Sequence, residues 1–400
     1  MEQQQLEQYR VDHLILLVGG NPLPNYVAAR VLAKPGATLH FVHTQKTDPI
    51  AKRLSDALKL PAENDQLGRD FATSQFIQVD ESNPRDIFDK VKEIASALPR
   101  DKKIGLNYTG GNRPMSVHAY DAVDETRSDA IFSYLDAGRL TMLIHDQQRS
   151  TRLVRADKLL NMRLETLLKL QGLTQKGKEP SDKPLQPKLA AALAELHTTD
   201  EGADAWFDWR KKSDGWKKLP KGEPRLEKIE AALREMCGDQ EPTPECVAQA
   251  LGQNSLPSCA KWFKGGWLES HVLSQLQEAI RERSDTDDAL MSIQRTRDGQ
   301  NDELDIDVVV MRSYQMFVFS CMVSKQDDPC KFHAMEAYVR ARQTGGDEAR
   351  VCLVCTYSKP DQLQKKLVSE LDAGGKIKVF GQKDLMSLST KISDWLNQQP

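Results

Sequence analysis

The first 150 residues constrain the fold most, because apolar, β-rich runs alternate there with stretches of helical spacing. Helical stretches separate the first five runs at the length typical of β–α–β units, which predicts a mostly parallel sheet covered on both faces. Only residues 136–139 separate the last two runs, and this short spacing predicts a closing hairpin. The six runs lie at 13–18, 38–42, 75–79, 103–108, 130–135 and 140–145. The region is therefore expected to be a Rossmann-like α/β domain.

The loop after the fourth run is suited to a phosphate-bearing ligand. Gly110 and Gly111 allow close approach of a ligand to the backbone, and the helix expected over 114–124 begins with free N–H groups that attract phosphate. No Lys-Ser/Thr pair follows the glycines, so the loop is not a Walker loop, and it lacks the six-residue dinucleotide fingerprint. Amide, hydroxyl and guanidinium groups would hold the ligand. The alternative is a purely structural Gly-Gly turn.

Polar residues also follow the first two runs, and three loops are thus expected to converge. Ligands of open parallel sheets bind at the carboxyl ends of the strands, so this convergence predicts a pocket there. The predicted ligand-binding residues are Gly19, Gly20, Asn21, Pro24, Asn25, Thr44, Asn107, Thr109, Gly110, Gly111, Asn112 and Arg113.

The rest of the chain predicts a helical middle region and a second sheet domain. With 400 residues, two or three domains are expected. We assign 1–150 to the ligand-sensing domain, 151–260 to a helical linker or middle region, and 261–400 to a mixed-sheet domain. Within the middle region, 206–221 interleaves tryptophans with lysines. This segment either stacks on nucleic acid or, as we favour slightly, forms a tryptophan core with solvated lysines.

Bulk composition narrows the class of protein. The net charge is −3, so any nucleic-acid binding must come from a local patch. No apolar run reaches the length of a membrane span, and the polar first ten residues predict no signal peptide. The seven cysteines are odd in number and irregularly spaced, which predicts reduced thiols and a cytoplasmic location. Cys352 and Cys355 are expected to be packed core thiols.

A cluster of carboxylates marks the second sheet domain. Glu303, Asp305 and Asp307 alternate at the start of an apolar strand, so they share one face. Divalent cations neutralise such a face well, and Glu269 on the preceding helix adds a fourth oxygen ligand. The alternative is a solvated edge strand with ordinary surface acids.

The order of these motifs resembles a known family. The PD-(D/E)xK nuclease fold is resembled by Gly-Trp-Leu-Glu at 266–269, Glu-Leu-Asp at 303–305, a strand ending near 317–321, Glu336-Ala337-Tyr338 and Gly345-Gly346. Pro24-Asn25 and the stretch 109–112 resemble the ligand loops of CARF domains. Together they resemble the CARF–nuclease effectors of type III CRISPR systems that cyclic tetra-adenylate activates. The resemblance covers 11–150 and 261–397.

The resemblance implies a homodimer that binds one cyclic tetra-adenylate across its two-fold axis. It also implies cutting of DNA, RNA or both with Mn²⁺ or Mg²⁺ in antiviral defence. The residues expected to perform the chemistry are Glu269, Glu303, Asp305, Ser320 and Lys325, and the expected metal ligands are Glu269, Asp305 and Asp307.

One departure from the family pattern leaves two functions open. Ser320-Cys321-Met322 stands where a carboxylate-x-Lys motif is expected, and a thioether carries no charge. Lys325 and Lys331 are the nearest substitutes. The chain is therefore either an active nuclease with a migrated lysine or a non-catalytic cyclic-oligoadenylate sensor with a degenerate nuclease domain.

Overall fold

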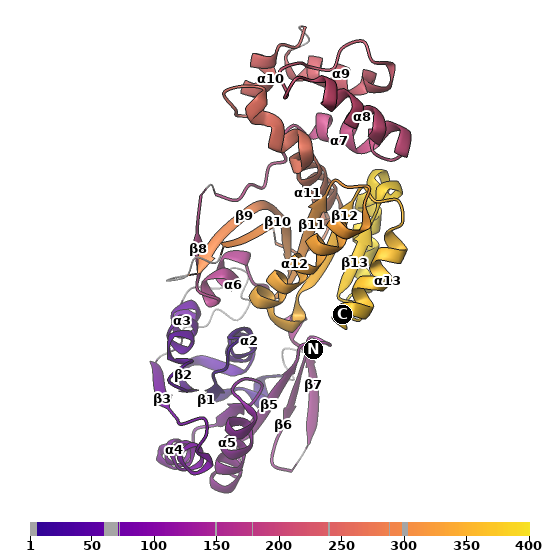
Figure 1. Cartoon of the computed structure of the whole chain (residues 1–400). Coiled ribbons are helices and arrows are strands. Elements are labelled where there is room, and N and C mark those ends of the chain that lie inside the picture. Colours follow the sequence, from indigo (N-terminus) through magenta and orange to yellow (C-terminus); the bar gives the residue numbers. More distant parts are fainter. Residues whose placement is uncertain are drawn as a thin grey trace.

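The protein contains two sheets joined by helices (Figure 1). The computed structural model describes residues 6–59, 71, 73–148, 150–177, 179–238, 241–287, 289–297 and 303–400. In Figure 1 the N-terminal sheet lies at one end, a group of helices at the other, and the second sheet between them. The predicted mixed α/β class, with a Rossmann-like first sheet and a second mixed sheet, is confirmed.

The N-terminal sheet has the strand order β3-β2-β1-β4-β5-β6-β7. Its first five strands are parallel, and the last two are antiparallel additions, the first of them forming the predicted hairpin with β5. The strands are β1 (Val11–Leu17), β2 (Ala33–His43), β3 (Thr73–Gln78), β4 (Ile104–Asn107), β5 (Ile131–Asp136), β6 (Thr141–His145) and β7 (Thr151–Arg155). The helices are α2 (Leu23–Leu32), α3 (Asp48–Lys59), α4 (Pro84–Ala97) and α5 (Arg113–Thr126).

Burial explains why the central strand is apolar throughout. Leu14 and Leu16 of β1 belong to one hydrophobic core, whereas Ile15 and Leu17 belong to another on the opposite face. Because successive side chains of a strand point to opposite faces, helices must cover both sides of the sheet.

Strand β7 was not expected, because most of its side chains are exposed and its sequence is polar. The chain then passes through η2 (Ala156–Lys158) and α6 (Leu164–Leu170). Its next strand, β8 (Leu173–Gln175), pairs with the edge of the second sheet. Part of the region 151–260, predicted as a helical linker or middle region, therefore belongs to a sheet, because β8 pairs with β9 more than 100 residues later.

The helical middle region consists of α7 (Pro187–Leu196), α8 (Asp200–Lys212), α9 (Glu227–Met236) and α10 (Pro244–Ala250). Trp206 and Trp216 are 1% and 7% exposed; Trp216 stacks on Phe263, and the Trp206 ring lies tilted against the same ring. The favoured interpretation of this segment as a tryptophan core is confirmed.

The expectation of seven reduced cysteines is wrong at one pair. Cys237 ends α9 and Cys246 lies in the first turn of α10, and the short connection between the helices brings their sulfurs into a disulfide. The other five cysteines are free, and Cys352 and Cys355 are buried core thiols as expected.

The second sheet has the order β13-β12-β11-β10-β9-β8. Its elements are α11 (Trp267–Ile280), β9 (Leu290–Arg297), β10 (Glu303–Arg312), β11 (Gln315–Met322), α12 (Asp327–Gly345), β12 (Arg350–Cys355), α13 (Pro360–Leu371), β13 (Ile377–Phe380) and α14 (Leu388–Gln398). Helix α12 follows β11 and lies against β11 and β12 (Figure 1). Within the described ranges, no helix is both long and apolar enough to span a membrane.

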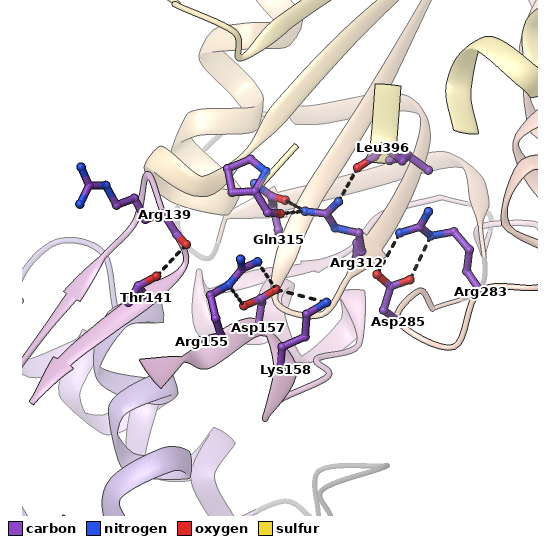
Figure 2. Close-up of polar contacts among 11 residues, drawn as sticks. Arg139, Thr141, Arg155, Asp157, Lys158, Arg283, Asp285, Arg312, Gln315 and Leu396 are labelled. Carbon is purple, nitrogen blue, oxygen red and sulfur yellow. Dashed lines mark hydrogen bonds and ion pairs between the residues drawn. The ribbon is translucent and has the colours of Figure 1, made fainter. Parts of the chain in front are cut away.

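Polar contacts fill the junction between the two sheets (Figure 2). Next to the N-terminal sheet, Arg155 pairs with Asp157 at 2.8 Å. On the other side, Arg312 donates to Gln315 and to the main chain of Leu396. One main-chain hydrogen bond crosses the junction: the Met162 N–H donates to the Ser313 oxygen at 2.7 Å. The two sheets therefore meet through specific contacts.

Candidate ligand loops and candidate carboxylate site

Two of the predicted loops meet where the strand order of the N-terminal sheet reverses. Strands β1 and β4 are neighbours there, with crossovers leading away on both sides. A Cβ on Gly19 would lie 2.9 Å from the nitrogen of Gly111, and one on Gly110 would lie 2.1 Å from the oxygen of Leu17. The loops therefore pack backbone against backbone at the point where ligands of such sheets bind.

Asn25 is the polar residue at the centre of this contact. Its side chain is fully buried, and its Nδ2 donates to the Leu17 oxygen at 2.8 Å. Its Oδ1 has no hydrogen-bond partner among the described residues. A buried amide oxygen without a partner costs free energy, so this atom is a candidate acceptor for a ligand or for water.

Three predicted ligand residues hold the 107–113 loop in shape. Asn112 Oδ1 accepts from the Met115 N–H at 2.9 Å and caps α5. Thr109 Oγ1 accepts from the Leu135 N–H at 2.8 Å, and Asn107 donates to Ser133 Oγ at 2.9 Å. Arg113 is exposed in the first turn of α5, so its guanidinium is available to a phosphate.

The remaining loop residues are spread around this centre. Gly20 is exposed and Pro24 is half-buried. Thr44 is buried in a turn, where its N–H donates to Thr47 Oγ1 at 2.9 Å, and it lines a separate hollow of about 560 Å³ at the ends of β2 and β3. Asn21 points toward the second sheet domain, as described below.

The carboxylates lie on a cavity of about 280 Å³ in the second sheet domain. Leu304 and Ile306 are buried while Asp305 and Asp307 are not, so the predicted alternation along β10 is confirmed for these residues. The side chain of Glu303 lies outside the described part of the structure. The polar residues that line the cavity are Asp305, Asp307, Ser320, His333, Glu336 and Arg340.

Asp307 is held more firmly than the other acids. Its Oδ2 accepts from the Cys321 N–H at 2.7 Å, and His333 Nε2 lies 3.6 Å from the same oxygen. Arg340 donates to the main-chain oxygen of Asp305 at 2.9 Å and pairs with Glu336 at 2.7 Å. The cavity thus joins three acids to two cationic or basic side chains.

The electrostatics place Glu269 beside these acids. Burial, helped by the charges of Asp307 and Asp305 and opposed by Lys261 and His333, raises the pKa of Glu269 to about 8. Burial and the charge of Asp307 also raise the pKa of Asp305. The hydrogen bond to Asp307 raises the pKa of His333. The folded chain therefore concentrates more negative charge here than its own cations offset.

Two predicted sources of the missing cation lie elsewhere. Lys325 follows the end of β11 and turns to the helical region, where its Nζ donates to Asp204 at 2.6 Å. Lys331 pairs with Glu370 at 2.7 Å. Neither lysine lies at the carboxylate cavity. Strand β11 ends at Met322, before Lys325, and both lysines form ion pairs with acids of other helices.

On α12 the sequence pointed to Lys331 and to Glu336 as part of the nuclease pattern, but it did not identify His333 and Arg340. His333, Glu336 and Arg340 are spaced three and four residues apart, which puts them on one face of a helix. That spacing was visible, but only the packing of α12 against β11 shows that the face turns toward Asp307.

The carboxylate oxygens at this cavity are the type of ligand that a hard divalent cation prefers. No group of three or more His, Cys, Asp or Glu side chains within the described ranges is arranged closely enough to hold an ion. Glu269, Asp305 and Asp307 carry the carboxylate oxygens that such a cation prefers, and the raised pKa of Glu269 reflects nearby negative charge that a cation would offset.

We expect Glu269→Gln to stabilise the metal-free protein at pH 8 and not at pH 4. The pKa of Glu269 is about 8 in the folded state and about 4.5 otherwise, so wild-type stability falls as pH rises through this window. The Gln variant avoids that loss, on the order of 1–2 kcal/mol after allowance for solvent. Urea unfolding at both pH values with chelator tests this, and an equal difference at both would contradict it.

The fold and these two sites define a ligand-sensing α/β domain joined to a second mixed-sheet domain that carries a carboxylate cavity. Residues 13–161 match the family model of the Card1 CARF domain. This match agrees with the resemblance of the loop motifs to CARF domains.

Solved structures share the fold over most of the chain. Can2 from Sulfobacillus thermosulfidooxidans, in complex with cyclic tetra-adenylate, matches with a TM-score of 0.66 and 14% identity, covering 96% of this chain and 99% of that chain. Protein VC1899 from Vibrio cholerae matches with a TM-score of 0.68 and 15% identity, covering 96% and 98%. A type III CRISPR defence DNA nuclease activated by cyclic oligoadenylate matches with a TM-score of 0.51 and 18% identity, covering 86% and 45%. None of the curated proteins matches the sequence.

Proposed function

We propose that this protein is a metal-dependent endonuclease of type III CRISPR defence that a cyclic oligoadenylate activates. The proposal is carried by one combination in a single chain: residues 13–161 match the CARF family model, and a second domain has a cavity lined by Asp305 and Asp307 with Glu269 beside them. Cyclic tetra-adenylate is the proposed activator, and Can2, which shares the fold, was solved with that ligand.

The ligand would bind at the contact between the loops after β1 and β4. Asn25 offers an unpartnered acceptor, Arg113 a guanidinium, and the start of α5 free N–H groups. A homodimer suits this ligand, because a symmetric ring presents equivalent phosphates to two identical loops.

The carboxylate cavity would bind the scissile phosphate. Glu269, Asp305 and Asp307 would hold Mn²⁺ or Mg²⁺, which stabilises charge on the phosphate and acidifies water. Cys321 fixes Asp307 through its N–H group. His333 and Arg340 would take over the orienting role of the motif lysine, since both line the cavity and Met322 carries no charge.

We expect His333→Ala to lower ligand-stimulated cleavage by roughly 10²-fold, because it removes the basic group nearest to Asp307. Lys325→Ala removes a partly exposed pair with Asp204 and a hydrogen bond to the main chain of Asp200, and should change the rate by less than about fivefold. Initial rates on one substrate compare the two variants. A larger loss of rate in Lys325→Ala than in His333→Ala would contradict this assignment and place Lys325 in the active site.

A second function, a non-catalytic sensor, is favoured by one observation. Ser320 and Met322 replace the usual carboxylate and lysine. This function predicts that cyclic tetra-adenylate raises the melting temperature but that no DNA or RNA is cut in Mn²⁺ or Mg²⁺. Incubation with ligand, each metal, supercoiled plasmid and single-stranded RNA separates the two functions.

A further inference from the structure

One predicted ligand residue contacts the second sheet domain. Asn21 Oδ1 accepts from the Leu23 N–H at 3.1 Å and from Gln171 Nε2 at 3.3 Å, which fixes the side chain. Its Nδ2 lies so close to Gly346 that a Cβ there would be 2.3 Å away. Gly346 also has a φ of +71°, so both its backbone and its surroundings require glycine.

A buried carboxyl group lies at the same point. Glu348 is 1% exposed, and neither of its carboxylate oxygens has a hydrogen-bond partner among the described residues. Its Oε2 would be 2.7 Å from a Cβ on Gly346, so Asn21 and Glu348 approach the same backbone position. Burial raises the pKa of Glu348 to about 7. Burying a carboxyl group without hydrogen-bond partners costs free energy, and a hydrogen-bond donor that moves toward Glu348 would reduce this cost.

The main chain around Glu348 is anchored while its carboxyl is not. Gln315 Nε2 donates to the main-chain oxygen of Glu348 at 2.9 Å, and Arg350 Nη1 donates to the same main-chain oxygen at 2.7 Å. Gln315 in turn accepts from Arg312, within the junction that Figure 2 shows. The segment is therefore held to the second sheet, and Asn21 contacts it from the sensor side.

Helix α12 connects this point to the carboxylate cavity. Gly346 directly follows the helix, and a hollow of about 610 Å³ at this end is lined by Asn21, Tyr338 and Arg342 among others. His333, Glu336 and Arg340 of the same helix line the carboxylate cavity. Helix α12 thus has residues beside Asn21, in the loop 18–22 that we call the sensor loop, and residues at the carboxylate cavity.

We propose that Asn21, Gly346 and Glu348 couple the sensor loop to α12, so that ligand binding repositions His333 and Glu336 at the carboxylate cavity. The proposal rests on the proposed function for its ligand. Asn21 lies between Gly19, which packs on Gly111, and the start of α2, so a ligand that moves this loop moves Asn21. Coupling requires that loop position and helix position change together, which hydrogen exchange can follow.

The test compares two glycine variants. Gly346→Ala forces a Cβ against Asn21, whereas Gly375→Ala has the same type of backbone, with φ of +73°, and nothing within 4 Å. Glu348→Met removes the buried carboxyl and should fold well, since it leaves no unpaired polar group. Hydrogen exchange is measured for 18–25 and 327–345 in each protein, with and without cyclic tetra-adenylate, beside melting temperature and cleavage.

With ligand, we expect altered exchange in both segments for the wild type and for Gly375→Ala. In Gly346→Ala and Glu348→Met, exchange in 18–25 should still respond and the melting temperature should still rise, but the response in 327–345 should be lost. Ligand stimulation of cleavage should fall by about 5–150-fold. A response in 327–345 equal to that of Gly375→Ala would overturn the proposal.

A ligand-free comparison keeps the two proposals separable. If cyclic tetra-adenylate leaves the wild-type melting temperature unchanged, the proposed activator is wrong. The coupling is then decided without ligand, because Gly346→Ala should raise exchange in both segments above the level in Gly375→Ala. Equal exchange in the ligand-free variants would contradict the coupling.

Discussion

Asp307→Asn is expected to lower ligand-stimulated cleavage by roughly 10³-fold while cyclic tetra-adenylate still raises the melting temperature. Asp307 lies on the cavity, accepts from Cys321 and is closest to His333, so its charge is central to the site. Asp305→Asn should likewise remove cutting without affecting ligand binding, since Asp305 shares the cavity. Asparagine keeps the size of the side chain and removes only the charge needed for metal binding.

The control for this experiment is Asp361→Asn, which changes an exposed acid in the first turn of α13 away from the cavity. It carries the same loss of charge and should cut at the wild-type rate. The measurement is the initial rate of nicking and of RNA loss at saturating ligand and metal. Wild-type cutting by Asp307→Asn and by Asp305→Asn would refute the assignment of the site.

Gly110→Ala is expected to weaken cyclic tetra-adenylate binding by about 100-fold or more. Its Cβ would lie 2.1 Å from the backbone oxygen of Leu17 and 3.0 Å from Nδ2 of Asn25. Neither neighbour can yield easily, because the first is backbone and the second is fully buried. The loops must therefore separate at the point where the ligand is proposed to bind, at a stability cost of about 3 kcal/mol.

Gly374→Ala is the matched control, because a Cβ at that position would meet nothing within 4 Å. The measurement is the ligand-induced rise in melting temperature over a range of ligand concentrations. It should be lost or strongly right-shifted in Gly110→Ala and unchanged in Gly374→Ala. Equal shifts in the two variants would remove the binding role from this loop.

The fold was largely readable from the sequence because its two sheets have strong local patterns. The runs at 13–18 and 103–108 are apolar enough to be buried strands, and β1 and β4 lie where they were expected. Strands β7 and β8 were missed for a physical reason. Both are short edge strands, and pairing with β6 and with β9 decides their structure.

The candidate sites were predictable where a motif determines local geometry. The Gly110-Gly111 turn and the alternation of Asp305 and Asp307 follow from backbone rules, and both are present. The positions of Lys325 and His333 depend on which helix packs on which strand. Sequence spacing does not contain that information, so Lys325 and Lys331 were considered as the basic group and His333 was overlooked.

The most direct test of the central claim is cleavage of supercoiled plasmid and single-stranded RNA with Mn²⁺ or Mg²⁺, with and without cyclic tetra-adenylate. We predict that the wild type cuts at least one substrate only when ligand and metal are both present, and that Asp307→Asn does not. A wild-type protein that binds the ligand but cuts neither substrate with either metal would contradict the proposed nuclease function and favour the non-catalytic sensor.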